Sequence, residues 1–390
     1  MKKRLKIGIF MDSFYPAVDG VVLVVDNLCK ELSKYNDVTL VVPYTSSIKE
    51  DKGRSYDVVR IRSVKIPFTE YRVGEYKIPS SRAYKKLINK DFDIIHIHSP
   101  FTVGELGIRI AHDLCIPCIF TMHTRFDFEI RKVIDSDLVV NEVIRNIINT
   151  YNKCDDAIAI NNAMIKVFKD FGYMKKPTVI YNGTDLKPLK NKEKNIDIVN
   201  KKYNLKKDDT VFLFVGRITE IKNIFFILDA LKLLKEDGYK FKMFYVGSGP
   251  DELKLKHKIK EYGMKSDVIL TGKIMDRTLL SSIYARSSLF LFPSLFDASS
   301  LVQIEAAVNE TPGLFIEGSV TADTVINNVS GFTSKNDIIE YKKRIEEILG
   351  DKSLLDKVSH NARVMLGKTW EKIAKETYEF YLKKISNYRK

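Results

Sequence analysis

The stretch VFLFVGRITEIKNIFFILDALKLLKEDGYKFKMFYV, residues 211–246, decides the fold. It opens on a continuous apolar run, Val211–Val215, which is the pattern of a strand that is covered on both faces. A loop containing glycine follows, and then the amphipathic run Asn223–Glu236, which predicts a helix. Lys242–Val246 repeats the apolar pattern of the first strand. Strand, helix and strand in this order predict a right-handed βαβ unit in a parallel sheet.

The same alternation extends to both sides of this stretch. Apolar runs that predict further strands lie at 6–11, 38–42, 94–97, 116–122, 157–160, 178–180, 268–270, 289–293 and 314–316. Patterns that predict further helices lie at 21–34, 104–112, 251–262, 277–285 and 299–308. The chain is therefore predicted to be an α/β protein built of two doubly wound, Rossmann-like domains with parallel sheets.

A polar, charged stretch separates the two halves. Residues 186–209 contain few core-forming side chains, so we interpret them as a linker between an N-terminal domain, 1–185, and a C-terminal domain, 210–365. In the tail, 366–390, apolar residues recur at three- and four-residue spacing from Trp370, which predicts an amphipathic helix. We expect it to pack back across the N-terminal domain, with a helix lying on a membrane as the alternative.

The charge of the chain is uneven along its length. Its 390 residues include 64 Lys and Arg against 50 Asp and Glu, and its hydrophobic content of 45% excludes an intrinsically disordered chain. Residues 211–365 are nearly neutral, with 21 basic and 20 acidic side chains, whereas the excess lies in 51–100, 186–210 and 366–390. This pattern favours an anionic partner other than nucleic acid. A lysine-rich composition that implies no partner is the alternative.

No apolar run approaches the roughly 18–20 residues of a membrane-spanning helix. The first apolar run, at residues 7–11, is too short for a secretory signal. We therefore expect a cytoplasmic protein, which can rest on the inner face of the cell membrane without crossing it.

Two cations follow the strand at Val211–Val215. Arg217 and Lys222 lie on the loop at its carboxyl end, where doubly wound domains bind their ligands. A planar guanidinium and a compact ammonium can together hold a diphosphate. We interpret the pair as a candidate diphosphate site, with solvated loop cations as the alternative.

Two carboxylates flank the start of the helix that is predicted near Ser299. Asp297 precedes the helix, and Glu305 follows eight residues later, inside it. Free backbone N–H groups at a helix start form an anion site, here at Ser299, Ser300 and Leu301. A buried carboxylate at Glu305 suits hydrogen bonds to both hydroxyls of a ribose. The alternative is a cap at Asp297 and an ordinary polar side chain at Glu305.

Further candidates lie at strand ends in the N-terminal half. Gly20 opens the helix after the first strand, and a glycine there lets N–H groups approach a phosphate, although an ordinary turn is the alternative. Its loop lacks the G-x-G-x-x-G pattern, which disfavours a dinucleotide oxidoreductase. His123 is a candidate hydrogen-bond donor to a substrate, with a buried core histidine as the alternative. His96 and His98 share a strand face, but no further ligand completes a metal site.

Taken in order, these motifs resemble those of a retaining GT-B glycosyltransferase of family four, over nearly the whole chain. The matching stretches are the loop at Gly20, His-x-His-x-Pro at 96–100, Thr-x-His-Thr at 121–124, Asn182-Gly-Thr-Asp185, Gly216-Arg-x-x-x-x-Lys222-Asn, Val246-Gly-Ser-Gly-Pro250, Gly272, Asp297 with Glu305, and Thr311-Pro312. Their order and spacing are specific, although no single motif is. The N-terminal motif is most similar to that of bacterial diacylglycerol glucosyltransferases.

The resemblance implies a GT-B fold, in which two domains face a central cleft, and a nucleotide diphosphate sugar that binds mainly to the C-terminal domain. Arg217 and Lys222 would hold the diphosphate, so that no cofactor and no essential metal is expected. Glu305 would hold the ribose hydroxyls. Asp297 would contact the donor sugar as a catalytic residue, and Gly20 would face the donor phosphate.

The resemblance also assigns the remaining contacts. The amides of Ser300 and Leu301 would contact sugar hydroxyls or phosphates. Backbone near Lys273 and Ile274 would contact the base. His123 would act on the sugar from the acceptor domain as a second catalytic residue, and the leaving phosphate would accept the proton of the acceptor.

Three departures from the family pattern bear on the choice of donor. The family usually has Glu at the position of Asp297 and Gly at the position of Ser300, and its Gly-Gly-x-x-Glu stretch is replaced by Gly318–Asp323. We nevertheless expect transfer of a hexose, glucose by resemblance, from a UDP-linked donor to a membrane lipid with retention of configuration. The alternatives are a soluble or polysaccharide-linked acceptor and a non-catalytic homologue that binds sugar nucleotides.

Lipid-acceptor members of the family bind anionic membranes through basic, aromatic segments. A comparable segment runs from Arg54 to Lys90. It includes Arg60, Arg62, Lys65, Phe68, Tyr71, Arg72, Tyr76, Lys77, Arg82, Tyr84, Lys85 and Lys86. Each cation near an anionic surface adds roughly 1 kcal/mol to binding. We therefore expect this segment to contact an anionic membrane.

Overall fold

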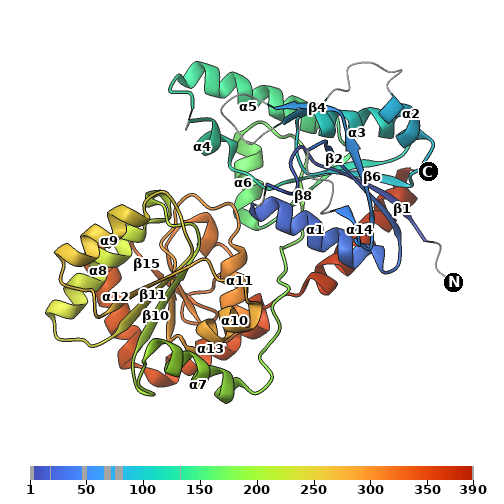
Figure 1. Ribbon diagram of the computed structural model, residues 1–390. Coiled ribbons are helices and arrows are strands. Elements are labelled where there is room, and N and C mark those ends of the chain that lie inside the picture. Colours follow the sequence, from blue (N-terminus) through green and yellow to red (C-terminus); the bar gives the residue numbers. More distant parts are fainter. Residues whose placement is uncertain are drawn as a thin grey trace. The chain divides into compact units, whose positions relative to one another are not determined.

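A computed structural model describes residues 4–17, 19–45, 51–65, 72–74, 82–131 and 133–388. The chain divides into two compact units (Figure 1). Unit 1 comprises Met1–Gly183 together with Trp370–Lys390, and unit 2 comprises Thr184–Thr369. Among the described residues, no helix combines the length and the apolar character needed to cross a membrane.

Unit 1 is built on a seven-stranded parallel sheet in the order β3-β2-β1-β6-β7-β8-β9. Its strands are β1 (Lys6–Phe10), β2 (Asp37–Pro43), β3 (Asp57–Ile61), β6 (Ile94–Ile97), β7 (Cys118–Met122), β8 (Asp156–Ala159) and β9 (Thr178–Val179). Its helices are α1 (Gly20–Ser33), α2 (Arg82–Ile88), α3 (Thr102–Asp113), α4 (Phe126–Arg131), α5 (Asp137–Asn152), α6 (Asn162–Asp170) and α14 (Trp370–Tyr388). A separate antiparallel pair joins β4 (Ser63–Lys65) and β5 (Arg72–Gly74).

Unit 2 is built on a six-stranded parallel sheet in the order β12-β11-β10-β13-β14-β15. Its strands are β10 (Val211–Val215), β11 (Lys242–Val246), β12 (Val268–Gly272), β13 (Leu289–Leu291), β14 (Gly313–Ile316) and β15 (Phe332–Ser334). Its helices are α7 (Lys192–Tyr203), α8 (Ile224–Glu236), α9 (Glu252–Glu261), α10 (Arg277–Arg286), α11 (Leu301–Val308), α12 (Ile338–Gly350) and α13 (Lys352–Leu366), and two 3-10 turns are η2 (Glu220–Lys222) and η3 (Val320–Ala322).

These sheets confirm the predicted fold class of two doubly wound, parallel-sheet domains. β10 is buried along its whole length, as expected for a strand that is covered on both faces. Figure 1 shows α8, α9 and α12 on one side of its sheet and α10 and α11 on the other. The order of strands reverses next to β10 and next to β1, and such switch points are where doubly wound sheets bind ligands at their carboxyl ends.

The segment 186–209 is not the simple linker that the sequence indicated. It contains α7, which packs against α10, and it contributes Val199 and Leu205 to the core of unit 2. The prediction failed because α7 buries only a narrow apolar stripe, and its polar residues dominate the composition.

The tail forms α14, which belongs to unit 1 and packs against α1. Trp370, Ile373 and Tyr381 lie on its buried face. The apolar spacing that predicted the helix therefore also identified the side that packs.

Candidate functional site

The loop after β10 is fixed by the loop after β11. Ile218 donates its backbone N–H to the carbonyl of Ser248 at 3.1 Å. A Cβ atom on Gly249 would come within 2.1 Å of the carbonyl oxygen of Ile218, so only glycine allows this approach. Backbone contacts therefore hold the loop that carries Arg217, whose side chain is exposed at the carboxyl end of the sheet.

Lys222 and Asp297 form an ion pair between the ends of β10 and β13. Their side chains are 23% and 17% exposed, and the ammonium of Lys222 lies 5.8 Å from the ring centroid of Phe292. The side chain of Asn223 donates to the carbonyl of Pro293 at 2.8 Å, which ties the two loops together. Two candidates that the sequence assigned to different roles thus meet at the switch point of the sheet.

Three buried polar atoms, one in this pair and two beside it, have no hydrogen-bond partner within the described part of the chain. They are Oδ2 of Asp297, Oγ of Ser294 and Oγ of Ser300. Ser300 is the N-cap residue of α11, but its hydroxyl makes no capping hydrogen bond. An unmet buried polar group costs about 1–3 kcal/mol, and native proteins contain few of them. Three such atoms between residues 294 and 300 make this stretch a candidate binding site for a ligand that carries hydroxyl groups.

Glu305 lies in α11 and is 8% exposed. One carboxylate oxygen accepts from Nη2 of Arg277 at 2.9 Å, and the other accepts from the hydroxyl of Tyr284 at 3.1 Å. Burial raises the pKa of Glu305, and the Arg277 cation opposes that rise. The carboxylate is therefore oriented and partly neutralised by Arg277 and Tyr284.

Arg277, like Tyr284, is a residue of this site that the sequence did not reveal. It is the first residue of α10, and it also forms an ion pair with Asp185. A cation at the start of a helix is opposed by the helix dipole, which was a signal that it has a specific partner. That partner could not be identified because α10 and α11 are brought together only by the fold.

Three other predicted contacts lie at strand or helix ends in unit 2. Lys273 is exposed directly after β12, and Ile274 is half-buried against the core. Leu301 is the first residue of α11. These positions fit backbone contacts to a ligand, and their roles stay predictions.

In unit 1, His123 follows β7 and lies beside His98, which follows β6. The Nε2 atom of His123 is 2.8 Å from Nδ1 of His98. Burial lowers the pKa of His123 to about 3, so the ring is neutral at physiological pH. The role of His123 towards a substrate stays a prediction, but its Nε2 atom is already engaged.

Gly20 begins α1, and open space surrounds the position that a Cβ would take. The sequence predicted a phosphate contact through the amides here. However, the carboxylate of Asp19 caps this helix and accepts from the N–H of Val22 at 2.8 Å. A phosphate at Gly20 would therefore have to share the helix start with a carboxylate of the chain itself.

Asp12 lies two residues after β1 and caps a different helix, α3. Its carboxylate accepts from the N–H groups of Val103 at 2.7 Å and Gly104 at 3.3 Å, and from the hydroxyls of Ser99 at 2.6 Å and Thr102 at 3.1 Å. Burial raises the pKa of Asp12, although these hydrogen bonds act against the rise. The residue anchors one end of the β1–α1 loop.

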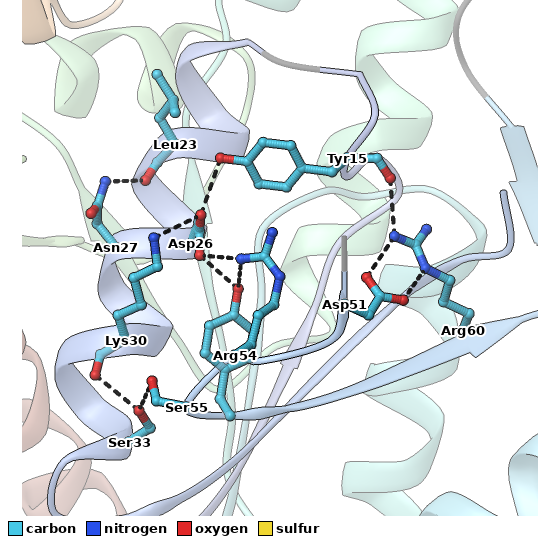
Figure 2. Close-up of polar contacts among 11 residues, drawn as sticks. Tyr15, Leu23, Asp26, Asn27, Lys30, Ser33, Asp51, Arg54, Ser55 and Arg60 are labelled. Carbon is cyan, nitrogen blue, oxygen red and sulfur yellow. Dashed lines mark hydrogen bonds and ion pairs between the residues drawn. The ribbon is translucent and has the colours of Figure 1, made fainter. Parts of the chain in front are cut away.

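Arg60 anchors the same loop at Tyr15 (Figure 2). The guanidinium donates to the carbonyl of Tyr15 at 3.0 Å and makes a bidentate pair with Asp51 at 2.6 and 2.9 Å. The Arg60 side chain is only 6% exposed. The expectation that Arg60 contacts a membrane is therefore wrong, because its guanidinium is paired with Asp51 and Tyr15 inside unit 1.

The phenol of Tyr15 reaches a second buried cluster on α1. Asp26 accepts from Tyr15 at 3.1 Å, from Tyr56 at 2.7 Å, from Arg54 at 2.6 Å and from Lys30 at 3.1 Å (Figure 2). Burial raises the pKa of Tyr15 to about 12, so the phenol stays protonated and donates. Arg54 is also internal to unit 1 and does not face a membrane.

The rest of the expected membrane segment divides into three groups. Tyr84 and Lys90 are half-buried and engaged within unit 1, where Tyr84 donates to Asp113 and Lys90 pairs with Asp57 at 2.9 Å. Arg62, Lys65, Arg82, Lys85 and Lys86 are exposed. Phe68, Tyr71, Tyr76 and Lys77, together with the side chain of Arg72, lie outside the described residues. In the parts of the chain that are described, no group of three or more His, Cys, Asp or Glu side chains is arranged to hold a metal ion.

Two family models together match most of the sequence. Residues 18–188 match Glycosyltransferase Family 4, and residues 195–365 match Glycosyl transferases group 1. The chain is a family-four glycosyltransferase. The first match covers most of unit 1 apart from β1 and α14, and the second lies within unit 2, so the family resemblance seen in the motifs is confirmed.

Relatives of this glycosyltransferase include two proteins named alpha-monoglucosyldiacylglycerol synthase. The protein of Streptococcus pneumoniae (strain ATCC BAA-255 / R6) is 25% identical over 79% of this chain and 70% of its own length. The protein of Acholeplasma laidlawii is 25% identical over 96% of this chain and 94% of its own length. Among solved structures, Anabaena HepE in complex with UDP and glucose aligns over 97% of this chain and 99% of its own, with a TM-score of 0.75 and 16% identity. The last likeness supports the GT-B fold.

Proposed function

We propose that this glycosyltransferase transfers a hexose, glucose in the first instance, from a UDP-linked donor to a membrane lipid with retention of anomeric configuration. The observation that supports the donor site is the Lys222–Asp297 pair at the switch point of unit 2, where Oδ2 of Asp297 and the hydroxyls of Ser294 and Ser300 are buried without a hydrogen-bond partner. The two relatives named for a glucosylated diacylglycerol support the choice of sugar and acceptor, and HepE supports UDP.

Each candidate group has a distinct task in this proposal. Lys222 and Arg217 offset the charge that develops on the leaving diphosphate, which is the kind of stabilisation that positioned cations provide best. Asp297 and the start of α11 hold sugar hydroxyls, and Glu305 holds the ribose. Because the protein supplies these cations, we expect turnover to continue in the presence of EDTA.

A radiolabelled or coupled assay with UDP-glucose and diacylglycerol in mixed micelles tests the proposal. Lys222→Met and Asp297→Asn should each lower turnover by about 10²–10³-fold, as for other groups that stabilise a transition state. Lys256→Met is the matched control, because Lys256 pairs with Glu252 on the surface of α9 in the same unit and its side chain is 53% exposed. An equal loss of turnover in the control, or no loss of turnover in the two site variants, would contradict the assignment of the donor site.

A soluble or polysaccharide-linked acceptor is the second candidate. The observation that favours it is the burial of Arg54 and Arg60, which leaves fewer cations for an anionic surface.

Co-sedimentation of the full chain with vesicles of phosphatidylglycerol and phosphatidylcholine distinguishes the lipid acceptor from the soluble one. Salt-sensitive binding that weakens in a Lys85→Glu, Lys86→Glu variant supports the lipid acceptor. Absence of binding together with transfer to a soluble glycan supports the second candidate.

A further inference from the structure

Three histidines lie together where β6 and β7 end. His96 is the third residue of β6, His98 follows that strand, and His123 follows β7. The ring centroids of His96 and His98 are 4.0 Å apart, and the rings of His98 and His123 are nearly parallel with centroids 5.1 Å apart. β6 and β7 are parallel neighbours, which brings their carboxyl ends to one edge of the sheet.

The contact between His98 and His123 has a definite chemical requirement. Nδ1 of His98 and Nε2 of His123 are 2.8 Å apart, so one nitrogen must carry the proton and the other must accept it. Burial lowers the pKa of both rings, which keeps both neutral at physiological pH. Either His98 donates through Nδ1 and His123 carries its proton on Nδ1, or His123 donates through Nε2 and carries its proton there.

The remaining nitrogen of His98 distinguishes these arrangements. Nε2 of His98 is buried and has no partner within the described part of the chain. If His123 donated, His98 would have to carry its own proton on this atom, as a buried N–H without an acceptor. Buried N–H groups without a partner are rarer than acceptors left without one. The arrangement in which His98 donates through Nδ1 is therefore favoured.

We propose that His98 is a positioning residue that holds His123 in its Nδ1–H tautomer. His123 then presents an N–H donor through Nδ1, the ring nitrogen that does not contact His98. The ligand class that suits this donor is a hydroxyl oxygen of a hexose. This inference rests on the proposed function for its substrate, but the tautomer itself does not depend on catalysis.

The test compares two replacements of His98 in the full chain. In His98→Asn the side-chain amide occupies the place of Nδ1 and retains a donor, whereas His98→Leu retains volume without a donor. Nitrogen-15 NMR of the histidine rings should show the Nδ1–H tautomer of His123 in the wild type and in His98→Asn. In His98→Leu the Nε2–H tautomer should become populated.

Steady-state kinetics with UDP-glucose provide the second measurement. We expect kcat to fall on the order of tenfold to a hundredfold in His98→Leu, the scale of a misplaced catalytic group, with little change in the KM for the donor. In His98→Asn the kcat should stay within about threefold of the wild type, which is a smaller loss than a misplaced catalytic group causes. Tyr381→Phe, which removes the hydroxyl 2.7 Å from Nδ1 of His96, is the control and should leave the His123 tautomer unchanged.

The Nε2–H tautomer on His123 in the wild type would overturn the inference even if no variant folds. Equal kinetic losses in His98→Asn and His98→Leu would overturn it as well. If His123→Ala turns over UDP-glucose like the wild type while the NMR result holds, then the proposed role of His123 in catalysis fails and the tautomer assignment stands.

Discussion

At the scale of single residues, the pairing of Glu305 with Arg277 leads to a pH prediction. Burial raises the pKa of Glu305, and Arg277 is the largest opposing influence. In Arg277→Met the carboxyl should therefore take up its proton at a higher pH than in the wild type. At pH 6 we expect UDP to bind about tenfold more weakly to Arg277→Met than to the wild type, equivalent to about 1.4 kcal/mol. The variant should recover part of this affinity as the pH rises. Calorimetric titration between pH 5.5 and 8 measures this.

Tyr284→Phe is the matched control, because it removes the other hydrogen bond of Glu305 without removing a charge. In Tyr284→Phe the loss of UDP affinity towards low pH should stay close to that of the wild type. Identical pH profiles for Arg277→Met and the wild type would show that Arg277 does not maintain the ionised carboxylate. From sequence, the position of Glu305 inside a helix was predictable, but its partners on α10 were not, because they depend on how two helices pack.

At the scale of elements, the two arginines of Figure 2 determine how firmly the β1–α1 loop is held. Arg60 is nearly buried with Asp51, and removal of one member of a buried pair costs about 3–5 kcal/mol. Arg60→Met should therefore lower the free energy of unfolding by an amount in this range. Urea denaturation followed by circular dichroism measures it.

Arg145→Met provides the comparison, since Arg145 pairs with Glu142 on the surface of α5 and its side chain is 70% exposed. Its cost should stay below about 1 kcal/mol. If the two variants were equally stable, the Arg60 cluster would not anchor the loop. The sequence reasoning took Arg60 for a surface cation because β3 was not predicted, and β3 places this side chain inside the unit.

An element that was not predicted also explains the error at residues 186–209. Strands such as β10 that are apolar throughout were recognised directly, because they are buried on both faces. α7 is a mostly polar helix, and its contacts with α10 become visible only in three dimensions. Element type was therefore predictable where an apolar run or a regular apolar stripe is buried, and it was missed in α7, whose buried residue is Val199.

At the scale of the whole molecule, buried His96 and half-buried His123 of unit 1 predict loss of stability in acid. Burial lowers the pKa of His96 and of His123 to about 3, below the value near 6.5 of an unfolded chain. The unfolded state therefore binds more protons between these values, and stability falls as the pH drops from about 6.5 towards 3, by about 1.4 kcal/mol per pH unit for each histidine. Tyr381, Thr121 and His98 contact His96, and a charge on His123 also lowers its pKa.

Urea unfolding at pH 7.5, 6.5 and 5.5 tests this prediction above the range in which most carboxylates titrate. His96→Gln should show a shallower dependence on pH than the wild type. His360→Gln, which alters an exposed histidine on α13 of unit 2, should leave the slope unchanged. A flat profile in the wild type would contradict the burial of neutral histidines.

The central claim is that unit 2 holds the nucleotide sugar between the loop after β10 and the start of α11. Hydrogen–deuterium exchange of the full chain, with and without saturating UDP-glucose, tests it most directly. We predict slower exchange in peptides that cover residues 216–223 and 297–305, and loss of this protection in Lys222→Met. Unchanged exchange in both segments while the donor is bound, or protection confined to other parts of unit 2, would contradict the account.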